Sequence, residues 1–246
     1  MPIDIAGTTL DTLLIKYRNE INIVNSGLIL YLDPGIASSY PGTGIMWYDF
    51  LGNGITAELV NGPSYSSNNS GFFIFDGVND YATSTITGSH ILNPVGNVLS
   101  FSLWVNNRSA SSLYILSSGA QTSSAGLAFS YQAGVPFAII RNSTNGFYHE
   151  FGAANFPLNV WINWTVTCDG SSLKVYKNGI FLSQQSTPNQ AGYASALNTL
   201  TIGVPNNAVA NFLANMYFGS LLIYNKTLSA AEIAQNFNAQ RRRYGI

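Results

Sequence analysis

The chain has 246 residues, of which 46% are hydrophobic and only 9% are charged, and its formal net charge at pH 7 is −1. This balance provides no long-range positive field, which argues against binding to nucleic acid or to an anionic membrane surface. The polar surface must consist mainly of Asn, Ser, Thr, Gln and Gly, which hydrogen-bond water and sugars without adding charge.

Three further features restrict the class of protein. Cys168 is the single cysteine, so no intrachain disulfide can form. No run of eighteen apolar residues predicts a membrane span. The first residues lack the basic segment and long apolar stretch of a signal peptide, so we expect no secretory signal.

Residues 1–25 differ from the rest of the chain and are predicted to form a short amphipathic helix, with an extended arm as the alternative. Thr8 and Asp11 have the spacing of a capping box, and apolar residues follow at helical spacing. A lone helix of this length is marginal in water, so its apolar stripe must pack on its own domain, on a symmetry mate or on another protein. We interpret this stripe as an assembly segment: Leu10, Leu13, Leu14, Tyr17 and Ile21.

From Gly27 onward the pattern indicates β-strands. Short runs rich in Phe, Tyr, Trp, Ile and Val alternate with Gly, Asn and Ser clusters. Within 99–105 the odd-numbered residues face one way and Ser100, Ser102 and Trp104 face the other. The predicted strands are 29–32, 72–75, 99–105, 113–116, 126–131, 137–140, 161–168, 173–177, 180–183, 200–202 and 216–224.

Two local signals are specific. Asn178-Gly179 between β-prone runs predicts a two-residue type I′ hairpin turn, which needs positive φ at both positions. Ser229 and Glu232 form a capping box that predicts one late helix, to which Leu228, Ile233 and Phe237 supply apolar contacts. Many short strands with one late helix predict two packed antiparallel sheets.

The order of the motifs resembles the laminin-G-like, concanavalin A-like lectin/glucanase superfamily, and most of all the versions found in bacteriophage and other viral structural proteins. The resemblance covers about residues 27–240. Its motifs are 27–33 (GLILYLD), 39–44 (SYPGTG), 47–49 (WYD), 52–54 (GNG), 61–65 (NGPSY), 75–81 (FDGVNDY), 175–179 (VYKNG) and 223–233 (IYNKTLSAAEI).

The resemblance implies an all-β fold, a concanavalin A-like antiparallel β-sandwich (jelly roll) with a short C-terminal helix. We expect three segments: an N-terminal arm or short helix at 1–25, a laminin-G-like sandwich at 26–240 and a basic C-terminal tail at 241–246. The arginines of this tail, Arg241–Arg243, are interpreted as solvated or as a contact to a partner.

No constellation of catalytic side chains is found, so we expect a protein that is not an enzyme. Glycoside hydrolysis needs two carboxyl groups flanking the scissile bond. The four glutamates are far apart in the sequence, and no strand carries alternating carboxylates: they are Glu20, Glu58, Glu150 and Glu232. His90 and His149 lie in unrelated segments, without a Ser or Cys nucleophile setting.

The resemblance implies two kinds of binding site. Calcium is the one metal that the family and the sequence allow, with Asp76 and Asp80 as hard oxygen ligands or, alternatively, as turn residues; no other cofactor is expected. Glycan recognition would use loop-tip aromatic residues, among which Trp47 also fits a core position. The candidates are Tyr40, Trp47, Tyr48, Tyr148 and Tyr193.

The function implied is that of a virion structural or appendage protein: a capsid decoration, a fibre or a tail-associated subunit that contacts host glycans. Its expected partners are other virion proteins and further copies of itself, with a trimer as one arrangement, and its expected location is the virion. The alternative is a stand-alone carbohydrate-binding adhesion module.

Overall fold

The computed structural model describes residues 22–91, 98–118, 126–132, 135–141, 146–151, 156–186, 198–205 and 212–246. The predicted stripe from Leu10 to Ile21 lies outside the described residues, so its helix or arm and its role in assembly stay predictions. No helix within the described residues is long and apolar enough to cross a membrane.

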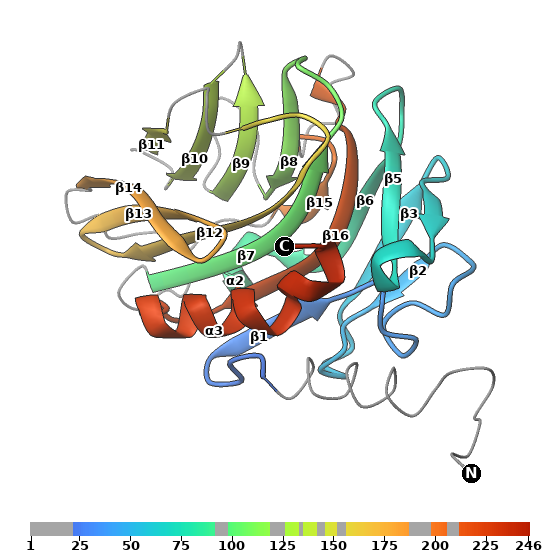
Figure 1. Cartoon of the computed structure of the whole chain (residues 1–246), viewed down its shortest axis with the longest axis horizontal. Coiled ribbons are helices and arrows are strands. Elements are labelled where there is room, and N and C mark those ends of the chain that lie inside the picture. Colours follow the sequence, from blue (N-terminus) through green and yellow to red (C-terminus); the bar gives the residue numbers. More distant parts are fainter. Residues whose placement is uncertain are drawn as a thin grey trace.

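Two antiparallel sheets form the molecule (Figure 1). The β7 sheet runs in the order β14 (Ile180–Ser186), β13 (Ser172–Lys177), β12 (Trp161–Asp169), β7 (Val98–Asn107), β16 (Asn215–Tyr224), β5 (Phe72–Asp76) and β4 (Ser64–Ser66), and β1 (Leu28–Leu32) also pairs with β16. The β8 sheet runs in the order β11 (Gly146–Glu150), β10 (Val135–Arg141), β9 (Gly126–Gln132), β8 (Leu113–Ser117), β15 (Thr199–Ile202), β6 (Tyr81–Thr87), β3 (Thr56–Val60) and β2 (Met46–Tyr48). The helical elements are η1 (Asn68–Ser70), α2 (Gly88–Ile91), α3 (Ala230–Gln240) and η4 (Arg241–Tyr244).

The main core lies between the two sheets and follows the predicted alternation. Leu99, Phe101, Leu103 and Val105 of β7 are buried in this core. The ring of Phe101 meets that of Phe129 from the opposite sheet, with centroids 6.0 Å apart. This arrangement confirms the predicted concanavalin A-like antiparallel sandwich.

The opposite face of the β7 sheet, here called the outer face, is covered in part by α3 and η4. Trp104, on the other side of β7 from the core residues, stacks on Tyr244 at 4.1 Å and on Phe237 at 5.8 Å. The Ser229 Oγ accepts a hydrogen bond from the Glu232 N–H, and a Glu232 carboxylate oxygen accepts one from the Ser229 N–H. The predicted capping box is therefore present, and it sets the first residue of α3.

The expected solvated C-terminal tail is wrong for Arg243 and Tyr244, whereas Arg241 and Arg242 are exposed. The Arg243 side chain is only 9% exposed, and its Nη1 lies 2.6 Å from Oδ2 of the buried Asp33. Its Nε and Nη2 donate to the backbone carbonyls of Asn69 and Gly71. Residues 241–244 instead continue α3 as η4 because Arg243 finds three acceptors inside the domain and Tyr244 packs on Trp104.

The predicted boundary near residue 26 also differs from the structure. Ile23 and Val24 are buried, and the Val24 N–H donates to Asn236 Oδ1 at 2.9 Å. Gln235 Nε2 donates to the Asn22 carbonyl at 2.9 Å. The sandwich domain therefore begins at or before Asn22, because these residues pack on α3.

The hairpin between β13 and β14 is formed as predicted. Lys177 pairs with Ile180, so Asn178 and Gly179 are its two turn residues, with φ of 52° and 77°. A Cβ atom at position 179 would lie 3.1 Å from the Phe237 side chain. The turn thus requires a glycine for its backbone angle and for its close approach to α3.

We predict that Gly179→Val lowers the free energy of unfolding by about 2 kcal/mol, since a β-branched residue is strained at positive φ. Gly54→Val is the matched control, because Gly54 has the same φ of 77° with no atom within 4 Å of the added Cβ. Thermal unfolding of both variants separates backbone strain from the contact with Phe237. A Gly179→Val protein that melts with the wild type would contradict the turn assignment.

Candidate ligand-binding surface

Two of the predicted sugar-binding aromatic residues lie in the core and cannot offer a ring to a ligand. Tyr40 is 5% exposed and donates its hydroxyl to the Gly44 carbonyl, and Trp47 is fully buried and donates Nε1 to Ser39 Oγ. Tyr48 is 44% exposed and remains a candidate.

The other two aromatic candidates remain predictions. Tyr148 belongs to β11 but its side chain lies outside the described part of the chain, as does the whole of Tyr193. Two of the four glutamates also lie outside the described part of the chain: all of Glu20, and the side chain of Glu150. Glu58 lies on β3, whereas Glu232 caps α3 on the other side of the sandwich.

Asp76 and Asp80 lie together, in the turn between β5 and β6. Asp76 Oδ1 accepts the N–H groups of Val78 and Asn79, at 2.7 and 3.3 Å, and these bonds lower the pKa of Asp76. The buried Asp80 accepts the Asp76 N–H at 3.2 Å, and burial raises its pKa. No third Asp, Glu, His or Cys joins them among the described residues. Their visible role is to close the turn.

An aromatic row crosses the outer face beyond the end of η4. Asn106 of β7 pairs with Trp161 of β12 on one side and with Tyr217 of β16 on the other. Directly opposed residues of antiparallel strands share a face, and Asn106 is two residues from Trp104, so all three side chains lie on the outer face. Three strands thus align two aromatic side chains with an amide between them.

The rings of this row form one cluster with Phe72 of β5. Phe72 is buried, and its ring centroid lies 5.0 Å from that of Tyr217 and 5.4 Å from that of Trp161. Trp161 and Tyr217 remain half-buried. Tyr244 touches Trp161 at 4.7 Å, so the cluster begins where η4 ends.

A polar row lies next to the aromatic row, two residues further along each strand. Asn215 pairs with Asp76, and the Arg108 N–H donates to the Asn215 carbonyl at 3.0 Å. The Arg108 guanidinium lies over the Tyr217 ring, with Cζ 4.6 Å from its centroid. We call the group formed by Phe72, Asn106, Arg108, Trp161 and Tyr217 the outer-face platform.

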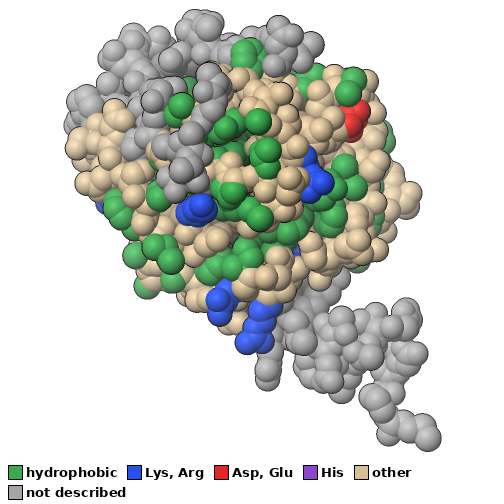
Figure 2. Space-filling view, turned by 45° about the horizontal axis from the view of Figure 1, so that its top comes forward, with side chains coloured by type: hydrophobic (Ala, Val, Ile, Leu, Met, Phe, Trp, Pro, Cys, Tyr) green, Lys and Arg blue, Asp and Glu red, His purple; other side chains and the backbone are tan. Residues whose placement is uncertain are grey.

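The platform combines the two kinds of group that bind sugars: aromatic surface for the apolar face of a sugar ring, and planar amide and guanidinium groups for its hydroxyls. Its rings converge into one cluster, because the Trp161 ring centroid lies 5.4 Å from that of the buried Phe72 and 6.4 Å from that of Tyr217. Figure 2 shows a face of the molecule on which hydrophobic side chains gather among uncharged polar groups, with a few separate Lys and Arg side chains.

Sequence reasoning missed Trp161 and Tyr217, although a signal existed. Both are out of phase with the residues of their strands that face the core: Ile162 and Trp164 in β12, and Met216 and Phe218 in β16. An aromatic residue in the outward phase of an amphipathic strand is a better indicator of a surface ring than an aromatic residue in a Gly-rich loop.

We predict that EDTA leaves the melting temperature of the wild-type protein unchanged, because Asp76 and Asp80 already accept backbone N–H groups. Asp80→Ala should lower the melting temperature equally with and without added calcium. If EDTA instead destabilises the wild type, and Asp80→Ala removes that response, the turn is a calcium site.

The comparisons with known proteins agree with this architecture. The family model of the concanavalin A-like lectin/glucanases superfamily matches residues 76–234. Among curated proteins no match was found. Similar solved structures include the receptor-binding domain of botulinum neurotoxin type G (TM-score 0.64, 15% identity, 87% of this chain). They also include the binding domain of Paraclostridial Mosquitocidal Protein 1 (0.67, 14%, 87%) and that of botulinum neurotoxin DC in complex with SialylT (0.67, 16%, 88%).

The likeness to these toxins is one of fold, since the identities are low, and the chain spans about half of their length, 52% in each case. The family match is one of sequence: it extends from the turn at Asp76 through the capping box of α3, which is more than half of the chain. The chain therefore belongs to the concanavalin A-like lectin/glucanase superfamily.

Proposed function

We propose that this chain is a lectin-like module, without catalytic activity, that binds a glycan through the outer-face platform. The observation that carries the proposal is the pair of half-buried rings of Trp161 and Tyr217, with the exposed Arg108 beside them, next to the end of η4. Phe237 and Tyr244 cover Trp104 on the same face, so Trp161 and Tyr217 are the rings of this cluster that lie beyond the covered part.

The composition of the surface supports a sugar ligand over a protein ligand. The half-buried Asn215 places an amide beside the rings, and the buried Asn106 lies between their strands, with an Oδ1 that has no hydrogen-bond partner among the described residues. An aromatic surface interrupted by amides suits a ligand whose apolar faces alternate with hydroxyls. The toxin binding domain solved with SialylT has the same fold and supports the idea that a sandwich of this kind can belong to a glycan-binding protein.

We further propose that the module belongs to a virion, as a capsid decoration, fibre or tail-associated subunit. The phage-like motif order supports this, together with the apolar stripe of residues 1–21, which would serve assembly with other copies or other virion proteins. A stand-alone adhesion module is the alternative, and it shares the glycan-binding surface.

We predict that Trp161→Ala weakens binding to every saccharide that the wild type retains on a glycan array by at least tenfold, since it removes the largest ring of the platform. Phe181→Ala is the matched control: Phe181 is an aromatic residue of the same sheet, 51% exposed, at the hairpin between β13 and β14. Trp161→Phe should keep the fold and most of the affinity. Equal binding by the wild type and Trp161→Ala would contradict the proposal, as would sugar release that depends on one carboxylate.

The assembly role is tested by a chain that begins at Asn22, which retains the contacts of Asn22 and Val24 with α3. It should keep its β-type circular dichroism and melting temperature but form a smaller species by light scattering, or fail to join purified particles. Unfolding of the shortened chain would place residues 1–21 in the core. Absence of the full-length protein from particles would favour the adhesion module.

A further inference from the structure

We propose that the outer-face platform selects acidic saccharides, with the Arg108 guanidinium binding the carboxylate or sulfate of the ligand. The inference rests on the proposed glycan-binding function and names the ligand class of the same surface. It depends on how Arg108 is held, on the charges that surround it and on the low net charge of the chain.

Arg108 is held in place before any ligand binds. Its backbone N–H donates to the Asn215 carbonyl, and its guanidinium Cζ lies 4.6 Å from the Tyr217 ring centroid, within range of a cation–π contact. Tyr217 is in turn supported by the buried ring of Phe72 at 5.0 Å. A guanidinium fixed in this way loses less side-chain entropy on binding and offers its N–H fork to an anion in two parallel bonds.

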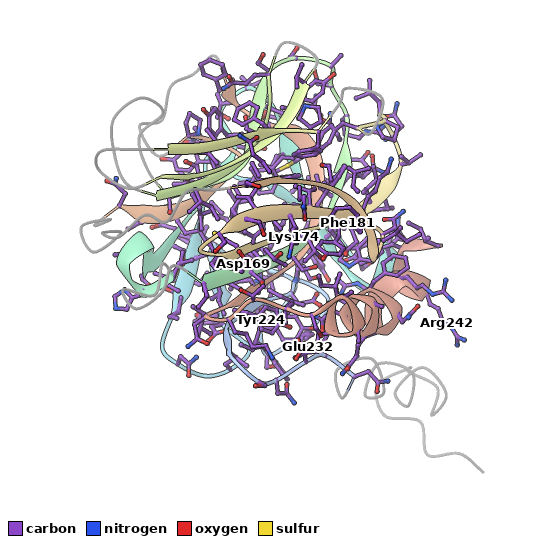
Figure 3. All side chains as sticks on the ribbon, turned by 90° about the vertical axis from the view of Figure 1, so that its left-hand side faces the viewer. Asp169, Lys174, Phe181, Tyr224, Glu232 and Arg242 are labelled. Carbon is purple, nitrogen blue, oxygen red and sulfur yellow. The ribbon has the colours of Figure 1, made fainter. Side chains whose placement is uncertain are left out.

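Arg108 has no carboxylate partner among the described residues. The three ion pairs found there use Lys174 with Asp169, Lys226 with Glu232, and Arg243 with Asp33. Figure 3 shows Asp169 and Lys174 on adjacent strands, Glu232 on α3, and Arg242 projecting away from the sandwich. The exposed Arg108 thus retains its charge for a ligand.

Asp76 is the acidic group that could oppose an anion here. It is exposed, and the N–H groups of its turn lower its pKa, so it is charged at neutral pH. It lies in the same cross-strand row as Arg108 with Asn215 between, so the two backbones are about 10 Å apart at two strand spacings. Its Oδ1 accepts the N–H groups of Val78 and Asn79, so part of its negative charge is offset within its own turn.

The surroundings favour a saccharide with single acidic groups over a polyanion. The net charge of −1 and one anchored arginine provide too little positive potential for nucleic acid. Trp161 and Tyr217 supply the apolar contact that a free phosphate or sulfate ion cannot use. A sugar that stacks on Trp161 and Tyr217 and places its acidic substituent at Arg108 uses both the aromatic and the cationic part of the platform.

The experiment compares matched ligands by calorimetry: 3′-sialyllactose against lactose, and galacturonic acid against its methyl ester, with a glycan array to extend the pairs. We expect the acidic member of each bound pair to bind at least tenfold more tightly. Arg108→Gln should remove that difference, so that the acidic and the neutral member of each pair bind with nearly equal affinity. Arg108→Lys should lose most of the difference, because it keeps the charge but not the fork.

Arg242→Gln is the matched control, since it removes an exposed arginine outside the platform and should change nothing. Asp76→Asn should change the preference for the acidic member by less than twofold.

Equal affinity for acidic and neutral members, or an Arg108→Gln protein that behaves like Arg242→Gln, overturns the inference. If Trp161→Ala abolishes binding while Arg108→Gln does not affect it, the proposed function stands and the acidic preference fails. If no saccharide binds, both fail.

Discussion

The buried ion pair between Arg243 and Asp33 determines which part of the outer face of the β7 sheet is covered by η4 and which part is left uncovered. Burial alone would lower the pKa of Arg243, but the Asp33 carboxylate more than offsets this and raises it. The guanidinium also donates to two backbone carbonyls, so its buried charge is matched by three acceptors. Removing one partner of such a pair leaves an uncompensated charge in the interior, which is far more costly than losing a surface ion pair.

The ion pair fixes η4, and η4 places Tyr244 where the sheet has room for it. A Cβ atom at Gly219 would lie 2.2 Å from the Tyr244 hydroxyl, so the glycine in β16 makes space for the ring. Tyr244 then stacks on Trp104, whose indole N–H donates to Gln240 Oε1 at 2.8 Å. The end of the covered face and the start of the platform are therefore set by one contact between distant parts of the chain.

Local signals predicted most of the fold, because alternation and caps act within a few residues. The hairpin at Asn178-Gly179 and the capping box of Ser229 are of this kind. The strands that the pattern missed, such as β2, β3 and β4, are short or carry polar residues, and they exist because neighbouring strands pair with them. The buried state of Arg243 has no local signal, since its partner is 210 residues away.

The candidate site was less predictable, because exposure depends on which face of a sheet a side chain joins and on what covers that face. Trp47 resembles a loop aromatic in sequence, yet it is buried against Phe73 and Phe218. Trp161 resembles a core strand residue, yet it reaches the surface because η4 ends beside it. The residues around the two tryptophans do not predict where η4 ends on the sheet, and that position decides whether Trp161 is covered.

The docking of Asn22 and Val24 on α3 has a mechanical consequence. If the module is tethered through its N-terminal segment and pulled by a ligand on the outer face, the load enters and leaves through the same side of the sandwich. It passes from the platform into β16 and from β16 into β1, which pairs with β16 and continues the chain from Asn22. The contacts of Asn22 and Val24 with α3 would yield first and leave the load on the β1–β16 pair, so the β7 sheet would carry the force and not the β8 sheet.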